Sequence, residues 1–130
     1  MKLIFDTHVW LWLVSEPARL SKKFRNELSA GKHDLVFSSV CAFETAVKHS
    51  LGKLALPMPA SDFVRQLRTL TGCETLTIDV PHAVMAGTLP WHHKDPFDRL
   101  LIAQALVEDV ALVSADQSVR LYNAKVIAPS

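Results

Sequence analysis

Short apolar runs of strand length alternate with longer segments of helical periodicity along this chain. Residues 2–6, 35–37 and 111–116 contain such runs, each followed by polar or turn-forming residues. The segments between them place apolar residues at helical spacing, and the longest, which opens at Asp95, is apolar around much of its circumference. Strands that alternate with helices form βαβ units. We therefore predict an α/β fold with a mostly parallel central sheet of four to five short strands flanked by helices.

Length and composition limit the class of protein. We expect one domain over residues 1–130, because 130 residues with 49% hydrophobic and 21% charged content suffice for a packed core. No stretch is long enough to span a membrane, so we expect no membrane association. Cys41 and Cys73 lack the spacing of a zinc site, and we interpret them as reduced residues of a cytoplasmic protein. A net charge of +1 and a pI near 7.9 argue against an extended nucleic-acid surface.

Four acids stand at the edge of apolar segments or inside them. Asp6 and Asp116 follow the first and last predicted strands, and the crevice beyond the carboxyl ends of parallel strands is the usual ligand site of such folds. Glu44 lies in a helix near its apolar face, and Asp98 is the third residue of the helix capped by Asp95. Each acid has a structural alternative: a turn residue for Asp6 and Asp116, a surface pair with Lys48 for Glu44, and a helix-dipole partner for Asp98.

A single cation site to which all four acids contribute explains their positions better than four independent structural roles. Two carboxylates ~5 Å apart repel by ~3 kcal/mol at an effective dielectric of 20, so converging acids require a cation. Oxygen ligands without well-spaced Cys or His favour Mg²⁺ or Mn²⁺. Such an ion polarises a phosphoryl oxygen and activates water for in-line attack, which suits phosphodiester hydrolysis.

Four segments carry motifs: LIFDTHV at residues 3–9, VK and LGKL within residues 47–54, HKDPFDRLLIAQA at residues 93–105, and LVSAD at residues 112–116. Together they resemble the PIN-domain family, in particular the VapC-type toxins of toxin–antitoxin pairs. The match runs in order over nearly the whole chain. Its most specific part is the run from Asp95 to Ala105, whereas Asp-Thr-His alone would be weak.

The resemblance implies a three-layer fold, a Mg²⁺- or Mn²⁺-dependent ribonuclease, a homodimer, and a partner antitoxin that neutralises the site. It makes Asp6 and Asp98 the principal metal ligands, with Asp116 completing the cluster. Glu44 would bind the metal or position its water. Thr7 and Ser114 match the small hydroxyl residues that support the site. Some members carry a further acid soon after the Asp116 position, and this chain does not.

The basic residues beside the acids allow more than one role. Arg99 could bind a substrate phosphate or pair with a neighbouring acid, and the sequence favours neither. His92 and His93 could contact phosphate, but adjacent histidines in a polar loop are more often solvated.

Other functions fit the pattern less well. A receiver-like signalling domain needs a second acid beside the first strand and a lysine after a later strand, and residues 7–8 and 114–115 supply neither. An aspartyl phosphatase needs an acid two positions after Asp6, where His8 stands. A catalytically silent PIN-like binding module, or another metal-dependent phosphoesterase, is the remaining alternative to a toxin ribonuclease.

Overall fold

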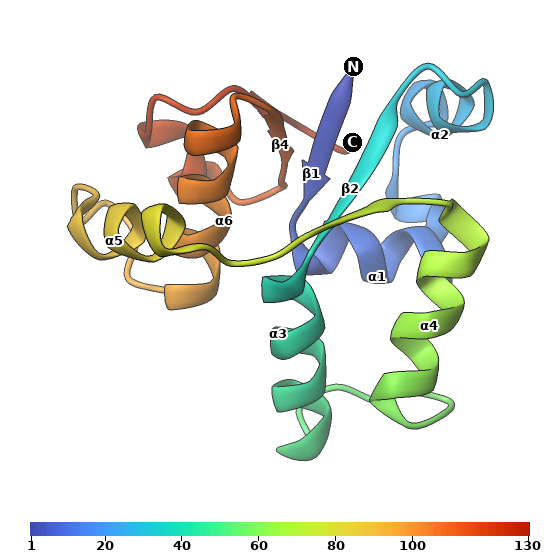
Figure 1. Ribbon diagram of the computed structural model, residues 1–130. Helices are drawn as coiled ribbons and strands as arrows, with labels where there is room; N and C mark the ends of the chain where they lie inside the picture. Colours follow the sequence, from blue (N-terminus) through green and yellow to red (C-terminus); the bar gives the residue numbers. More distant parts are fainter.

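The central sheet has five strands, all parallel, in the order β3-β2-β1-β4-β5. Figure 1 shows β1 between β2 and β4. A computed structural model describes residues 1–130. The strands are β1 (Lys2–Phe5), β2 (Asp34–Ser38), β3 (Glu74–Leu76), β4 (Ala111–Val113) and β5 (Val126–Ile127). The predicted α/β fold and parallel sheet are therefore confirmed. The two-residue strand β5 lies outside the strand runs predicted from the sequence, because two residues carry no detectable periodicity.

Six α-helices and two 3₁₀ helices connect the strands. They are α1 (Thr7–Ser15), η1 (Pro17–Arg19), α2 (Lys22–Ser29), α3 (Ser39–Ser50), α4 (Ala60–Thr71), α5 (Val80–Thr88), α6 (Pro96–Glu108) and η2 (Gln117–Leu121). No helix is long and apolar enough to cross a bilayer.

Most helices begin at a side chain that accepts a hydrogen bond from the first turn. Ser21 accepts from the backbone N–H of Phe24, and Asp95 accepts from that of Asp98. The helix α4 ends at Gly72, whose φ of 61° is the left-handed conformation that glycine adopts without a steric cost. These helix boundaries follow from local signals in the sequence.

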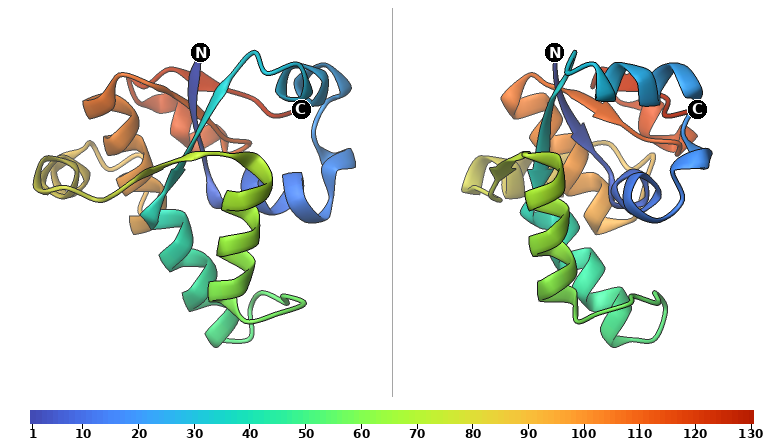
Figure 2. Two further views of the ribbon diagram at one scale, coloured as in Figure 1. Left: turned by 45° about the vertical axis from the view of Figure 1, so that its right-hand side comes forward. Right: turned by 90° about the vertical axis from the view of Figure 1, so that its right-hand side faces the viewer.

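The helices lie on both sides of the sheet. The two views of Figure 2 show α1 and α2 on one side and α5 and α6 on the other, while α3 and α4 project together beyond the carboxyl end of β2. The chain adds β2 and β3 on one side of β1, then crosses over to add β4 and β5 on the other. The strand order thus reverses at β1, and the carboxyl ends of β1 and β4 border the switch point where open α/β sheets bind ligands.

The core is built around β1. Leu3, Ile4 and Phe5 have no exposed surface, and the Phe5 ring lies 4.7 Å from that of Trp10, centroid to centroid. The Trp10 ring also meets Phe37 edge-on at 5.4 Å. A fully packed β1 holds its carboxyl end, and the residues just after it, in a fixed position.

Candidate active site

Asp6 follows β1 directly and begins α1. Its Oδ1 atom accepts a 3.0 Å hydrogen bond from the backbone N–H of Val9, while its own N–H donates to the carbonyl of Val113 on β4. The residue is only 7% exposed. Burial raises the pKa of Asp6 against the opposing effect of a hydrogen bond from the Ser114 side chain, and the Glu44 carboxylate adds to the rise. Asp6 is therefore a buried acid at the switch point, within the electrostatic field of Glu44.

Glu44 projects from α3 into the interior and is 3% exposed. Its Oε1 atom accepts a 2.5 Å hydrogen bond from the Thr7 hydroxyl, and its Oε2 atom lies 2.5 Å from Nζ of Lys48, one turn along the same helix. The pair with Lys48 foreseen in the structural alternative thus exists, but its carboxylate is buried and not on the surface.

Asp98 occupies the first turn of α6, where its N–H donates to the Asp95 side chain. Burial raises the pKa of Asp98 to about 7, and the carboxylates of Asp95, Asp6 and Glu44 add to the rise, while His93 opposes it. Three of the four acids therefore share one electrostatic environment, although they come from β1, α3 and α6.

Asp116 lies beyond β4 and begins η2. It is the most exposed of the four acids, with 40% of its side chain accessible. Burial acts to raise the pKa of Asp116, but hydrogen bonds from the Ser118 backbone and from His93 outweigh it and lower the value. The Asp116 N–H donates to Oγ of Ser114, a residue 1% exposed, so Ser114 links the acids that follow β1 and β4.

His93 joins two of these acids, a role that the sequence did not reveal. Its Nε2 atom lies 2.9 Å from Oδ2 of Asp98 and 2.9 Å from Oδ2 of Asp116. The sequence favours a solvated histidine, yet the side chain is only 16% exposed. A histidine five residues before a helical acid, in a turn bounded by Pro90, is the sequence signal that could have suggested the contact.

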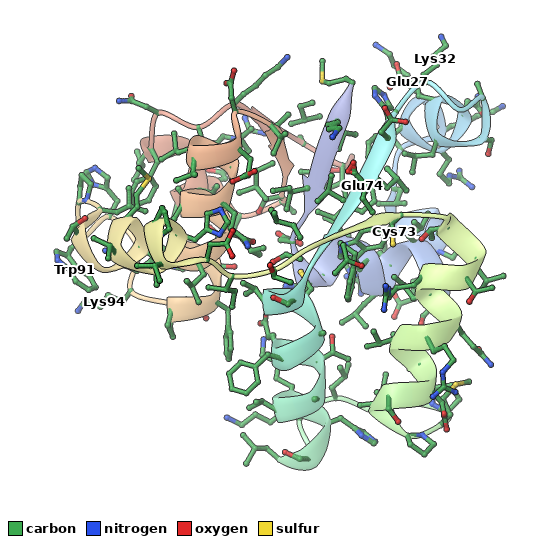
Figure 3. The ribbon with its side chains drawn as sticks, in the orientation of Figure 1. Glu27, Lys32, Cys73, Glu74, Trp91 and Lys94 are labelled. Carbon is green, nitrogen blue, oxygen red and sulfur yellow. The ribbon has the colours of Figure 1, made fainter.

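Arg99 contacts neither of the two partners that the sequence left open, because its guanidinium is bonded to backbone carbonyls and not to an acid or to open solvent. It is 3% exposed and donates hydrogen bonds to the carbonyls of Ala86, Leu89, Pro90 and His93. The Trp91 ring covers the guanidinium at 3.6 Å, and Figure 3 shows Trp91 at the outer side of this segment. Arg99 follows Asp98 in α6, and one residue corresponds to a rotation of about 100° around the helix axis. This rotation directs the Arg99 side chain toward α5. Its donors are used to hold α5 and the following turn.

The donor set fits a hard divalent cation. One ligand atom each from His93, Asp98 and Asp116 lie within 4.8 Å of one another, and the Asp6 and Glu44 carboxylates act on the pKa of Asp98 from close by. Lys48 offsets only part of this buried negative charge. Carboxylates whose pKa values are raised by burial and, to a smaller extent, by mutual repulsion are stabilised by a cation that binds their oxygens.

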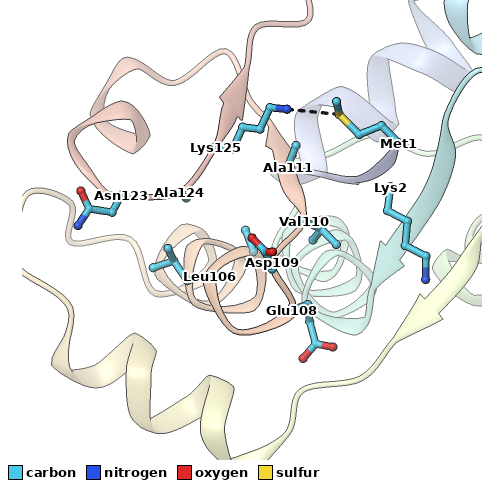
Figure 4. A pocket seen from close by; sticks show the side chains of 11 residues that line it. Met1, Lys2, Leu106, Glu108, Asp109, Val110, Ala111, Asn123, Ala124 and Lys125 are labelled. Carbon is cyan, nitrogen blue, oxygen red and sulfur yellow. Dashed lines mark hydrogen bonds between the residues drawn. The ribbon is translucent and has the colours of Figure 1, made fainter.

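A cavity at the opposite end of the strands is a separate feature. It measures about 460 Å³ and is lined by Met1, Lys2, Val110, Ala111 and Lys125 among others, at the amino ends of β1 and β4 (Figure 4). The acids follow the carboxyl ends of these strands. This cavity is therefore separate from the carboxylate site.

Comparison with known proteins adds independent findings. The model of the PIN domain family matches residues 3–125. Ribonuclease VapC22 of Mycobacterium tuberculosis is 29% identical over 119 residues, which make up 91% of this chain and 89% of that protein. The solved structure of VapBC2 from Rickettsia felis, bound to a DNA fragment from its promoter, is similar with a TM-score of 0.74 at 14% identity, over 98% of each chain. VapBC-1 from nontypeable Haemophilus influenzae gives a TM-score of 0.70 at 16% identity, again over 98% of each chain.

Proposed function

The chain belongs to the PIN-domain family, and on that premise we propose that it is a divalent-metal-dependent endoribonuclease, the toxin of a toxin–antitoxin pair. One observation carries the proposal. The charges of Asp6 and Glu44 act on Asp98 at the switch point of the sheet, and His93 lies between Asp98 and Asp116, while Lys48 offsets only part of the negative charge. Such a site needs a cation and suits the hydrolysis of a phosphodiester.

Asp6, Asp98 and Asp116 would hold Mg²⁺ or Mn²⁺, with Glu44 as a further ligand or as the residue that orients water. The bound ion supplies charge stabilisation at the phosphate and acidifies the attacking water. The protein's own residues place these groups. Asp98 lies at the amino end of α6, where the helix dipole favours its ionised form.

Thr7 and Ser114 support the acids without binding the ion. The Thr7 hydroxyl fixes one oxygen of Glu44, and Ser114 bonds both Asp6 and the backbone of Asp116. Both residues are buried, so their hydroxyl groups are held in one orientation. This support keeps the carboxylates in place before the substrate arrives.

The proposed substrate and partners follow from the relatives. RNA is the substrate class because the curated relative is a ribonuclease, and the solved relatives are VapBC complexes. We propose a cognate antitoxin that inserts a basic or bulky side chain among the acids, and a homodimer as the working form. Two free cysteines and an RNA substrate fit action in the cytoplasm.

The test compares wild type with Asp6→Asn and Asp98→Asn on a mixed cellular RNA, with and without EDTA. We expect cleavage by the wild type in Mn²⁺, loss by roughly 10²-fold or more in either variant, and loss in EDTA, with circular dichroism unchanged. Asp62→Asn is the matched control, because this acid is on the surface of α4 and pairs only with Arg65. Full activity of either site variant, or of the wild type in EDTA, would contradict the proposal. A folded wild type that binds metal but cuts no RNA would favour a silent binding module.

A further inference from the structure

We propose that His93 is a further functional residue of this site, and that it acts as a hydrogen-bond donor and not as a metal ligand. In the metal-free protein its Nε2–H donates to Asp116 and lies beside Asp98, and it donates to a phosphate oxygen of the substrate once a cation occupies the carboxylates. This inference rests on the proposed ribonuclease function, which it deepens by assigning a phosphate-binding group.

The ring nitrogens of His93 have defined roles. The backbone N–H of Asp95 lies 3.3 Å from Nδ1, and a backbone amide can only donate, so Nδ1 is the acceptor. A neutral imidazole that accepts at Nδ1 carries its proton at Nε2. The opposite side of the ring gives the same answer for Asp116, because Nε2 lies 2.9 Å from its Oδ2 atom and a carboxylate with a lowered pKa is ionised and only accepts.

The same geometry disfavours His93 as a ligand. Coordination through Nε2 requires a lone pair there, which would move the proton to Nδ1. Nδ1–H would then face the N–H of Asp95, and two donors would oppose each other. The cation is therefore left to the carboxylate oxygens, which Mg²⁺ and Mn²⁺ prefer.

The backbone of His93 is held by hydrogen bonds at both its N–H and its carbonyl group. The His93 N–H donates to the Tyr122 hydroxyl at 3.0 Å, and the His93 carbonyl accepts from Arg99 at 3.1 Å. The Tyr122 hydroxyl in turn donates to Pro90 at 2.6 Å. Arg99, for which substrate contact was one of two possible roles, thus supports the turn that carries His93. A preorganised N–H donor loses little freedom when negative charge develops next to it.

A cation that binds Asp98 and Asp116 competes for the oxygens that His93 now contacts. The Nε2–H would then be released from Asp116 and would be available to an oxygen of a phosphate held in the same site. One N–H group can therefore serve the carboxylates in the free protein and the phosphodiester in the complex. Its contribution is greatest as charge builds up on phosphorus oxygens.

The experiment uses the full chain with His93→Ala, His93→Gln and the matched control His92→Ala. His92 is exposed and meets the Tyr122 ring edge-on at 5.1 Å, without contact to an acid. Calorimetry without RNA measures Mn²⁺ affinity. Single-turnover cleavage of an RNA oligonucleotide, identified beforehand with the wild type, measures the rate and the concentration for half-maximal rate.

We expect His93→Ala to bind Mn²⁺ as tightly as the wild type or more tightly, because a competitor for the carboxylates is lost, and to cleave roughly 10²-fold more slowly. His93→Gln should recover at least tenfold over His93→Ala, since the glutamine amide offers an N–H at a similar reach. His92→Ala should match the wild type in both measurements.

Two results would overturn the inference while leaving the ribonuclease intact. A loss of Mn²⁺ affinity of tenfold or more in His93→Ala would make His93 a ligand or a support for one. Wild-type cleavage by His93→Ala would remove any role in the reaction. By contrast, a wild type that neither takes up Mn²⁺ nor cuts RNA would refute the proposed function itself.

Discussion

Oε2 of Glu44 lies 2.5 Å from Nζ of Lys48, so the most deeply buried acid of the site has its own counter-charge one helical turn away. The lysine is the more accessible partner, with 33% of its side chain exposed. The hydrogen bond and charge of Glu44 raise the pKa of Lys48, which keeps the lysine charged. The two residues therefore form one unit whose parts cannot be removed independently.

Replacing Lys48 with methionine should destabilise the metal-free protein by about 1–3 kcal/mol. Removal of one partner of a buried pair costs ~3–5 kcal/mol, and the partial exposure of Lys48 reduces this figure. Urea unfolding in EDTA measures the loss. The double variant Glu44→Gln/Lys48→Met should be more stable than Lys48→Met, and simple additivity of the two changes would contradict the coupling.

The stability of the metal-free protein should depend on pH through Asp98. Because the folded-state pKa of Asp98 is raised from its ordinary value of 3.8 to about 7, the folded protein retains this proton more strongly than the unfolded chain. The stabilising contribution is complete below about pH 4 and is lost as the pH rises to about 7. Asp98→Asn, which stays neutral, should therefore be more stable than wild type at pH 8 in EDTA, by on the order of 1–3 kcal/mol, and about equal at pH 4.

Thermal unfolding of the two proteins in EDTA at both pH values checks this expectation. The gain in stability of Asp98→Asn at pH 8 is reduced by ~0.3–1 kcal/mol, because the variant loses the favourable interaction of the charged acid with the α6 dipole. A wild type more stable than the variant at pH 8 would mean that the surroundings of Asp98 stabilise its charged form without metal, and would contradict this prediction.

Saturating Mn²⁺ should stabilise the wild type, because the ion binds only when the acids have been brought together. At a concentration 100-fold above the dissociation constant the gain is about 2.7 kcal/mol. Asp98→Asn should show much less of this stabilisation, and the surface variant Asp62→Asn should show all of it. Equal stabilisation of Asp98→Asn and the wild type would place the metal elsewhere.

Arg99→Lys should destabilise the protein by about 2–4 kcal/mol, even though the positive charge is kept. The three nitrogens of Arg99 donate to four carbonyls, and the single nitrogen of lysine cannot reach all of them. Buried carbonyl oxygens would therefore lose their donors. Urea unfolding gives the stability, and cleavage is compared at equal folded fractions. If the variant has unchanged stability but binds RNA more weakly, Arg99 contacts the substrate and this prediction is wrong.

Local signals predict the parts of the site that depend on a few neighbouring residues. The cap at Asp95, the first-turn proline at Pro96 and the helical place of Asp98 can be predicted together, because side chain and backbone donor are three residues apart. The positions of Asp6 and Asp116 beyond strand ends are predictable for the same reason. The ion pair of Glu44 with Lys48 also follows from helical spacing.

Long-range contacts could not be predicted in this way. The contact of His93 with Asp116 spans 23 residues, and the roles of His93 and Arg99 depend on where α5, Tyr122 and the turn after Pro90 come to lie. A loop histidine and a helical arginine have the same local pattern whether they face solvent, substrate or backbone. Only the packing of distant elements selects among these surroundings.

The sequence by itself determined the alternation of strands and helices, the helix caps and the four acids at the ends of apolar elements, because each rests on periodicity or on a hydrogen bond within one turn. The tertiary structure alone decided that three of the acids share one charge environment, that His93 lies between Asp98 and Asp116, and that Arg99 binds backbone carbonyls. The physical reason is that burial, desolvation and Coulomb coupling depend on distances between residues far apart in the chain, and those distances exist only after the sheet and its helices have packed.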